Sequence, residues 1–402
     1  MRILHVLQQL PMKTGSGVYY TNLIEELDKH GHENIMLYAN QNEFDFPKSD
    51  LRFEVEFKSD RLPFPIMGMS DIMPYDSTVF SEATDEMFDK VLDAYREKLI
   101  YIKENLKPDI IISHHLFLVT NLVKEVFADQ KVYAFCHGTD LRQIGQHEKF
   151  KKMLPNIPKL ERIFTVAPGE DAKISAIFDI QQEKITLIGG GFNQNIFNTN
   201  YKAEPRDFIK IMYAGKISES KGVFALAGAL PYIEEAHPDV ELHLVGHASE
   251  EQKKVLFVNA KNSDKLFVYN SQTQKTMAEK LKNSDIFVLP SYYEALGLIA
   301  IEALACGKLA VTSDIAGLKN QLGDKVNESG VILYTELPRI YDLDKPVAED
   351  VPAYEKRLAA NIINQIEKIK AGYKIPADIQ EEIDKNSWEK LALRVSEYLK
   401  QN

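Results

Sequence analysis

With 402 residues, 45% of them hydrophobic and 27% charged, the chain has the composition of a globular protein and enough length for two domains. Its net charge of −11 argues against nucleic-acid binding, which needs a cationic surface. Cys136 and Cys306 lack metal-ligand spacing, and neither a signal peptide nor an 18-residue apolar run is recognisable, so we expect a cytoplasmic protein with no zinc site and no transmembrane segment.

Short apolar runs alternate with helical segments along the first half of the chain. Residues 2–8 predict a strand, residues 18–29 a helix and residues 34–40 a second strand. This alternation is typical of a doubly wound parallel sheet. Further strands are predicted at 109–115, 131–138, 162–168 and 184–191.

The strand pattern restarts after a polar stretch that ends near residue 207, so we expect a second doubly wound domain with the boundary between residues 198 and 207. The final segment, about Ile379 to Lys400, is amphipathic and predicts a helix that needs a surface to cover. The strands of the second domain are predicted at 208–216, 240–247, 265–270, 285–291 and 309–314.

An insertion rich in proline and methionine, residues 62–81, precedes the strand at 109–115. It has neither helical nor strand periodicity, which predicts a long loop, and loops of this length are often functional. A capping flap without ligand contact is the alternative.

Two glutamates, Glu294 and Glu302, are separated by seven residues in an apolar segment. The segment predicts a strand, a loop, a helix closed by Gly307 and another strand. Glu294 falls in the loop at the carboxyl end of a strand, where open α/β sheets bind ligands; an acid favoured by the helix dipole is the alternative. Glu302 falls inside the helix among apolar residues, where an unpaired carboxylate is costly, so we expect it to need a partner.

Two lysines flank another loop between a strand and a helix. Gly215 and Lys216 are predicted at the strand end, and Lys221 and Gly222 where the helix starts. Ammonium groups and free helical N–H groups converge at such a position, which favours anion binding. Ordinary surface lysines are the alternative.

A glycine loop follows the first strand. Gly15, Ser16 and Gly17 allow close approach of a ligand to the backbone, although a merely tight turn is the alternative. Tyr20 and Asn40 stand where a dinucleotide fingerprint needs a small residue and an acid, which argues against nicotinamide binding.

Three histidines follow two neighbouring strands of the first domain: His114 and His115 after one, His137 after the next. Because the carboxyl ends of parallel strands share an edge, we expect these imidazoles to converge at the switch point of the sheet. Structural hydrogen-bonding histidines are the alternative.

These segments resemble the retaining GT-B glycosyltransferases of family 4, the glycosyl transferases group 1. Residues 290–307 resemble the E-x7-E signature of that family, and residues 215–222 its pair of diphosphate-binding cations. Lys216 stands where arginine is usual, and Asn193 where aspartate is frequent. The resemblance extends to the glycine loop (14–17), the HGTD segment (137–140), the interdomain hinge (189–197) and residues 314–322.

The resemblance implies the GT-B fold, with two Rossmann-like domains, residues 1–200 and 201–378, that face each other across a cleft. The final helix, residues 379–402, would pack back on the first domain. The implied reaction is the retaining transfer of a sugar from a nucleotide-sugar, with UDP favoured over GDP, to a hydroxyl of an unknown acceptor. Neither a cofactor nor a metal is implied, and no Asp-x-Asp motif follows a strand, residues 43–46 being the nearest imitation.

Position by position, the resemblance assigns Glu302 to the ribose hydroxyls, Glu294 to the donor sugar, and Lys216 and Lys221 to the leaving diphosphate. His137 would lie near the sugar from the side of the first domain. Further donor contacts are implied for Gly15, Ser16, Gly17, Gly215, Ala295, Leu296, Gly297 and Leu298, and acceptor-side contacts for His114, His115, Met69 and Asp71.

Three other interpretations stay open. A non-catalytic sugar-nucleotide-binding or adaptor protein would share the fold, and so would a sugar-nucleotide epimerase. Residues 149–162 are basic with interleaved apolar side chains and are a candidate for peripheral membrane docking, although two prolines interrupt any long amphipathic helix.

Overall fold

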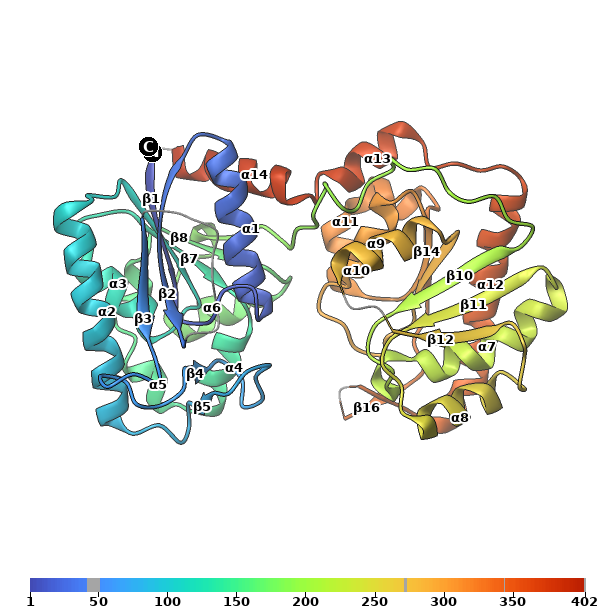
Figure 1. The fold of residues 1–402 in the computed structure, drawn as a ribbon, viewed down its shortest axis with the longest axis horizontal. Coiled ribbons are helices and arrows are strands. Elements are labelled where there is room, and N and C mark those ends of the chain that lie inside the picture. Colours follow the sequence, from blue (N-terminus) through green and yellow to red (C-terminus); the bar gives the residue numbers. More distant parts are fainter. Residues whose placement is uncertain (42–50, 271–272, 343, 401–402) are drawn as a thin grey trace. The chain divides into compact units, whose positions relative to one another are not determined.

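The structure, a computed structural model, describes residues 1–41, 51–270, 273–342 and 344–400. It divides into two compact units, Met1–Gly190 with Trp388–Asn402 and Gly191–Ser387, each built on its own sheet (Figure 1). The sequence placed the boundary near residue 200, whereas the chain leaves the first unit at Gly190. Phe192 already belongs to the second unit, because its N–H donates to the carbonyl of Asn386 over 3.1 Å.

A seven-stranded parallel sheet forms the centre of the first unit, in the order β3-β2-β1-β6-β7-β8-β9. The order reverses at β1 (Arg2–Leu7), which pairs with both β2 (Glu33–Asn40) and β6 (Ile110–His114). The loops after β1 and β6 therefore meet at the switch point, where sheets of this kind bind ligands. The other strands are β3 (Arg52–Glu56), β7 (Val132–Cys136), β8 (Arg162–Thr165) and β9 (Ile185–Leu187).

Helices bury both faces of this sheet. α2 (Asp85–Asn105) and α3 (Leu118–Val126) pack into a large core on one face. On the other face, α1 (Gly15–Lys29) and α14 (Trp388–Lys400) lie side by side, and the Trp388 ring meets Tyr19 edge-on with centroids 4.8 Å apart (Figure 1). Shorter helices are α4 (Thr139–Gln146), α5 (Lys149–Lys152) and α6 (Glu170–Phe178).

The segment predicted as one final helix forms two. α13 (Ala377–Asp384) packs in the second unit, and only α14 belongs to the first. The interruption has a local cause, because the side-chain amide of Asn386 donates to the carbonyl of Ile383 over 3.2 Å and the N–H of Ser387 to that of Asp384 over 3.0 Å. These bonds satisfy the last carbonyls of α13 and end the helix.

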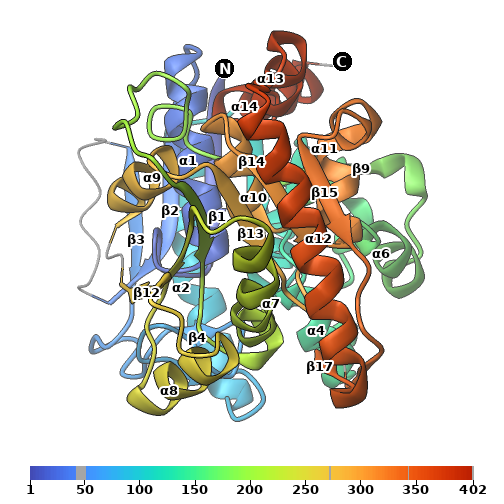
Figure 2. The same ribbon diagram turned by 90° about the vertical axis from the view of Figure 1, so that its right-hand side faces the viewer.

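The second unit holds a six-stranded parallel sheet in the order β12-β11-β10-β13-β14-β15, which reverses at β10 (Ile209–Ala214) and β13 (Ile286–Leu289). One face is covered by α7 (Val223–Ala236), α8 (Glu250–Asn259) and α12 (Val351–Lys370), of which α12 runs across the sheet in Figure 2. The opposite face carries α9 (Gln274–Lys282), α10 (Leu298–Ala305), α11 (Ala316–Glu328) and α13. The remaining large-sheet strands are β11 (Val240–Val245), β12 (Leu266–Tyr269), β14 (Leu309–Ser313) and β15 (Ile332–Thr335).

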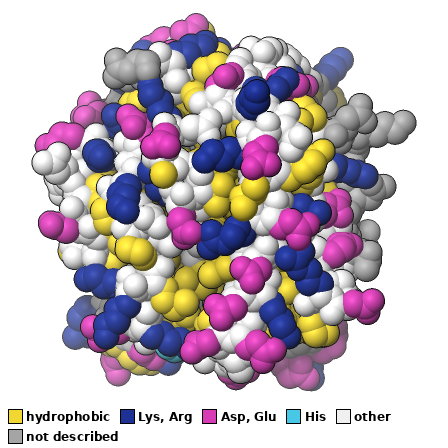
Figure 3. Space-filling model, turned by 90° about the vertical axis from the view of Figure 1, so that its left-hand side faces the viewer, with side chains coloured by type: hydrophobic (Ala, Val, Ile, Leu, Met, Phe, Trp, Pro, Cys, Tyr) yellow, Lys and Arg dark blue, Asp and Glu magenta, His cyan; other side chains and the backbone are white. Residues whose placement is uncertain are grey.

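The basic segment at 149–162 does not form the amphipathic surface that membrane docking needs. α5 spans only four residues, and the apolar side chains of the segment point into the core. On the face drawn in Figure 3, basic side chains of the described residues are interspersed with acidic ones. Within the described ranges, no helix is both long and apolar enough to cross a membrane. The buried apolar residues of the segment are Phe150, Leu154, Ile157 and Leu160.

We expect the first unit to depend on α14. Leu391 is fully buried against the sheet, so Leu391→Ala should lower the free energy of unfolding by about 2–5 kcal/mol. Trp388 is the only tryptophan of the chain and lies in this unit, so urea unfolding followed by its fluorescence reports the first unit alone. The matched control is Glu397→Ala on the exposed side of α14, expected to change stability by less than about 0.5 kcal/mol. Equal midpoints for the two variants would contradict the dependence.

Candidate functional site

In the second unit, two loops meet at the carboxyl ends of β10 and β13, which are paired neighbours. The N–H of Tyr292 donates to the carbonyl of Ser220 over 2.9 Å and joins the loops. Gly222 permits this approach, since it has φ +64° and a Cβ atom there would lie 1.9 Å from the carbonyl oxygen of Pro290. The junction thus places residues 215–222 against residues 290–297.

Two of the predicted residues form an ion pair at this junction. The Nζ of Lys221 lies 2.7 Å from Oε2 of Glu294, and both side chains are half-buried. The hydroxyl of Ser291 is 3.5 Å from the same carboxylate oxygen. Lys216 is exposed and has no ion pair within the described part of the chain, so one of the two lysines is neutralised and the other is free.

Glu302 lies in the middle of α10 and is half-buried among apolar side chains. Its carboxylate has neither a hydrogen bond nor an ion pair to any residue that the structure describes. Burial raises its pKa from 4.5 to about 8. The apolar sequence around Glu302 predicted that this carboxylate needs a partner, and no described residue of the protein supplies one.

Backbone donors complete the arrangement. The N–H groups of residues 295–298, where α10 begins at the left-handed Gly297 (φ +67°), make no hydrogen bond to a described residue. The first turn of an α-helix leaves such donors free, and they favour negative charge. Together with Lys216 and Lys221, they form a site suited to an anion with a hydroxyl-bearing group near Glu302. Of these residues, Ala295 is exposed and Leu296 is buried, while Gly215 ties its loop to β11 through its N–H, 3.0 Å from the carbonyl of Val245.

In the first unit the three histidines converge as expected. The Nδ1 of His114 lies 3.1 Å from Nε2 of His137, and the two rings are stacked with centroids 5.3 Å apart. The centroid of His115 is 4.9 Å from that of His137. Burial lowers the pKa of all three, so they are neutral at physiological pH. Nε2 of His114 and both ring nitrogens of His115 are buried without a partner among the described residues.

Two buried acids support this cluster. The carboxylate of Asp140 accepts hydrogen bonds from the N–H groups of Leu116, over 2.7 Å, and Leu141, over 3.2 Å, which fixes the turn after His115. Glu170, which the sequence analysis missed, lies against Gly138, and burial raises its pKa to about 7. The sequence feature that could have revealed Glu170 is its position after β8, because β8 is paired with β7, the strand that precedes His137.

The glycine loop is accounted for by the chain itself. α1 begins at Gly15, three residues before the predicted start, because the hydroxyl of Thr14 accepts the N–H of Gly17 over 3.1 Å. A Cβ atom on Gly17 would lie 2.5 Å from the carbonyl oxygen of Leu10, so this glycine allows an approach of backbone to backbone. Ser16 is buried beside it, whereas Gly15 is exposed.

The insertion at 62–81 is mostly loop, with two-residue strands β4 (Met67–Gly68) and β5 (Thr78–Val79). Glutamine side chains hold it near the end of β1. The amide of Gln9 donates to the carbonyl of Met67 over 2.9 Å, and that of Gln143 to the carbonyl of Met69 over 3.3 Å. Met69 is consequently buried, while Asp71 is exposed.

No group of three or more potential metal ligands occurs among the residues that the structure places. Residues 43–46, the nearest imitation of an Asp-x-Asp motif, lie outside the described residues.

The raised pKa of Glu302 predicts a pH-dependent stability. Between pH 4.5 and about 8 the folded chain holds a proton that the unfolded chain has lost, so the stability of the wild type falls as the pH rises through this window. Glu302→Gln removes this loss and should be more stable than the wild type by roughly 2–5 kcal/mol at alkaline pH. Calorimetry at acid and alkaline pH measures the difference, with the exposed Glu328→Gln as control. A difference that does not grow with pH would contradict the unpaired carboxylate.

Comparison with known proteins finds similarity in the region of these loops. The sequence model of the glycosyl transferases group 1 matches residues 196–339. A D-inositol 3-phosphate glycosyltransferase of Thermomonospora curvata is 28% identical over 50% of this chain and 47% of its own length. A glycogen synthase of Mycobacterium tuberculosis is 29% identical over 56% of each chain. The matched region spans about half the length of these curated relatives.

Solved structures match over the whole chain. A glycosyltransferase from Rickettsia africae has a TM-score of 0.66 at 17% identity and covers 100% of this chain and 99% of its own. A trehalose-6-phosphate structure from E. coli bound with UDP-2-fluoro glucose has a TM-score of 0.59 at 14% identity over 100% and 99%. These likenesses establish the GT-B fold that the sequence predicted, and the region matched by the model of the glycosyl transferases group 1 contains the loops that carry Lys216, Lys221, Glu294 and Glu302.

Proposed function

We propose that the protein is a retaining, metal-independent glycosyltransferase of family 4, which moves a hexose from a nucleotide-sugar to a hydroxyl group of an acceptor. One observation carries the proposal: the unpaired carboxylate of Glu302 lies on α10, and the free N–H groups at the start of this helix directly follow Glu294, the ion-pair partner of Lys221. A nucleotide-sugar supplies the complement, because ribose hydroxyls donate to a carboxylate and a diphosphate accepts from ammonium and amide groups.

In the second unit, we assign the leaving diphosphate to Lys216 and Lys221 with the N–H groups of residues 295–298. These donors stabilise the charge that grows on the diphosphate as the glycosidic bond breaks. The ion pair of Lys221 with Glu294 keeps both side chains in the site before the donor binds. The incoming diphosphate then competes for Lys221, and Glu294 faces the sugar. Gly215 holds the loop that carries Lys216.

In the first unit, we propose that His137 is a catalytic residue and that the residues around it bind the acceptor. The contact of His114 with His137 occupies one imidazole nitrogen of each ring, so the tautomer of one ring determines which tautomer the other must adopt. The free nitrogens of His115 suit a hydroxyl of the acceptor. Gly15, Ser16 and Gly17 remain proposed donor contacts, and Met69 and Asp71 proposed acceptor contacts.

We favour a UDP-sugar over a GDP-sugar as the donor, a cytoplasmic location and a hydroxyl of a glycan, a lipid-linked glycan or a small metabolite as the acceptor. The relative bound with UDP-2-fluoro glucose supports the base, and the relatives named for inositol phosphate and glycogen support a hydroxyl acceptor.

An epimerase is the second candidate, since a putative UDP-N-acetylglucosamine 2-epimerase from Listeria monocytogenes shares the fold with a TM-score of 0.56 at 10% identity. Incubation of the purified protein with single UDP-sugars, followed by NMR, separates the two, because an epimerase converts the donor without water or acceptor and a transferase does not. Hydrolysis of the donor to free sugar and UDP in the same samples identifies a transferase, and binding of the donor with neither epimerisation nor hydrolysis favours a non-catalytic protein.

The two glutamates should differ kinetically. Glu302 contacts the ribose equally in the ground and transition states, so Glu302→Ala should raise the donor KM by the equivalent of roughly 1–3 kcal/mol. Glu294→Gln and Lys221→Ala should lower kcat more than they raise KM, because they act where charge develops. The exposed Lys254→Ala is the control. Steady-state kinetics of the variants test these roles. An unchanged donor KM for Glu302→Ala, together with a change in KM alone for Glu294→Gln, would contradict the roles proposed for the two glutamates.

Transfer should also survive an excess of chelator, since two lysines and free N–H groups already supply the positive field at the diphosphate. The measurement compares initial rates with EDTA and with added manganese. A rate lost in EDTA and restored by manganese would reject the assignment of Lys216 and Lys221.

A further inference from the structure

An open cavity of about 330 Å³ lies in the second unit between α9 and the sheet. Lys210, at the beginning of β10, and Tyr269, at the end of β12, line it from the sheet, and Lys280 and Asn283 from α9 and its end. The proposed donor loops follow the carboxyl end of β10, so Lys210 belongs to the opposite edge of the sheet. The cavity is a separate feature of the unit, and none of its residues has a role in the proposed transfer.

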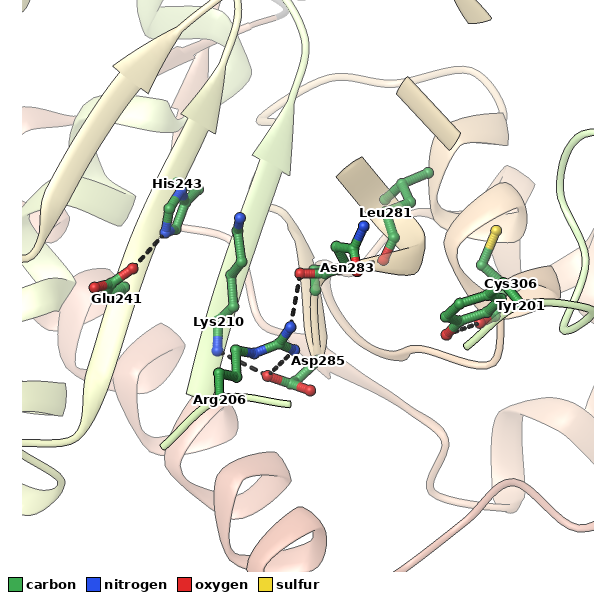
Figure 4. A network of polar contacts seen from close by, with 10 residues as sticks. Tyr201, Arg206, Lys210, Glu241, His243, Leu281, Asn283, Asp285 and Cys306 are labelled. Carbon is green, nitrogen blue, oxygen red and sulfur yellow. Dashed lines mark hydrogen bonds and ion pairs between the residues drawn. The ribbon is translucent and has the colours of Figure 1, made fainter. Parts of the chain in front are cut away.

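The sheet beneath the cavity carries a fixed polar chain. The Nε2 of His243 lies 2.9 Å from a carboxylate oxygen of Glu241, and its Nδ1 lies 3.0 Å from the hydroxyl of Tyr269. Phe267 stacks on the imidazole with ring centroids 4.7 Å apart. Burial lowers the pKa of His243 to about 4, so its ring is neutral at physiological pH. The neutral ring contacts the carboxylate of Glu241 (Figure 4).

The ammonium group of Lys210 is close enough to the carboxylates of Glu241 and Asp285 to interact electrostatically with them, but it pairs with neither. The backbone N–H of Lys210 donates to Oδ2 of Asp285 over 2.8 Å. The same carboxylate oxygen forms an ion pair with the guanidinium of Arg206 over 2.6 Å. The side chain of Lys210 extends away from that pair toward His243 (Figure 4). Its ammonium group makes no hydrogen bond or ion pair with a described residue. Burial and the neighbouring Arg206 and Lys280 lower its pKa.

Further positive charge surrounds this point. Lys280 lies 4.2 Å from the centroid of the Tyr269 ring and has no ion pair to a residue that the structure describes. The acids of the cavity, Glu204 and Glu279, are exposed and pair with neither Lys210 nor Lys280. In a chain of net charge −11, the inner end of this cavity is cationic and its outer part acidic.

We propose that this cavity is a second anion site, which binds the phosphate or carboxylate group of a small metabolite between Lys210 and Lys280. The volume falls within the range of small-molecule pockets, about 300–1,000 Å³. The anion pairs with two ammonium groups that have no ion-pair partner among the described residues. The proposal is independent of the transfer reaction, because it uses no residue of the donor site.

The test measures thermal stability of the full chain against glucose 6-phosphate, gluconate and uncharged glucose at constant ionic strength. Three double variants are compared: Lys210→Gln with Lys280→Gln at the cavity, Lys216→Ala with Lys221→Ala at the donor site, and Lys254→Gln with Lys275→Gln as a control of equal charge change on exposed surfaces. At a tenfold excess over Kd, an anion should raise the Tm by about 3 °C. The cavity variant should bind at least about tenfold more weakly, and the other two variants should bind like the wild type.

The comparison of the two anions shows whether the site binds a phosphate group, a carboxylate group or both. A Tm rise with glucose 6-phosphate alone indicates a phosphate site, a rise with gluconate alone a carboxylate site, and a rise with both a site for either group; each supports the proposal if the cavity variant loses it. The proposal is overturned if neither anion raises the Tm, if glucose raises it equally, if the cavity variant keeps the rise, or if the donor-site variant loses it.

Discussion

Both units depend on the burial of a parallel sheet on its two faces. Parallel strands need a crossover after each strand, and helices in these crossovers cover both faces of the sheet. The loops that leave the strands therefore fall on one edge. This constraint brings His114 and His137, from different strands, into contact in the first unit, and Lys221 and Glu294 in the second. The chemistry of each unit is assembled by topology and not by closeness in the sequence.

The candidate site keeps its charges poorly compensated. Glu302 has no partner, and the free N–H groups at the start of α10 lack acceptors among the described residues. The carboxylate of Glu294 pairs with Lys221 and is within 3.5 Å of the Ser291 hydroxyl. A protein selected for stability alone would replace Glu302 by an apolar residue, because its neighbours are apolar. Its presence is best explained by a ligand, and the same physical argument applies to Lys210 at the other edge of the sheet.

Much of this arrangement was predictable. Apolar runs and glycines fixed the strands and helices, and the burial of Glu302 followed from Ile301, Ala303 and Leu304 beside it. The histidines could be placed together because parallel strands share an edge. These inferences use local periodicity and one rule of topology.

The rest depended on contacts between distant residues. Nothing in the sequence shows that Gln9 and Gln143 hold the insertion, because an amide can bond to any backbone. The break between α13 and α14 depends on the side chain of Asn386, which is also compatible with a continuous helix. Glu170 was missed because its neighbour Gly138 is distant in the sequence. Lys210 was missed because the lack of a partner for its ammonium group is visible only in the folded chain.

The placement of α14 affects how the chain is made. The first unit ends at Gly190 but needs residues 388–400 to cover Tyr19, Leu23 and Phe135. During synthesis the intervening 197 residues, 191–387, must leave the ribosome first, which takes about 10–40 s at ordinary translation rates. Over that time one face of the first sheet stays exposed to water and to other chains, and the second unit is complete in sequence before residues 388–400 are made. The second unit, although later in the sequence, is thus the first that can finish folding, and the nascent first unit is the part most in need of a chaperone.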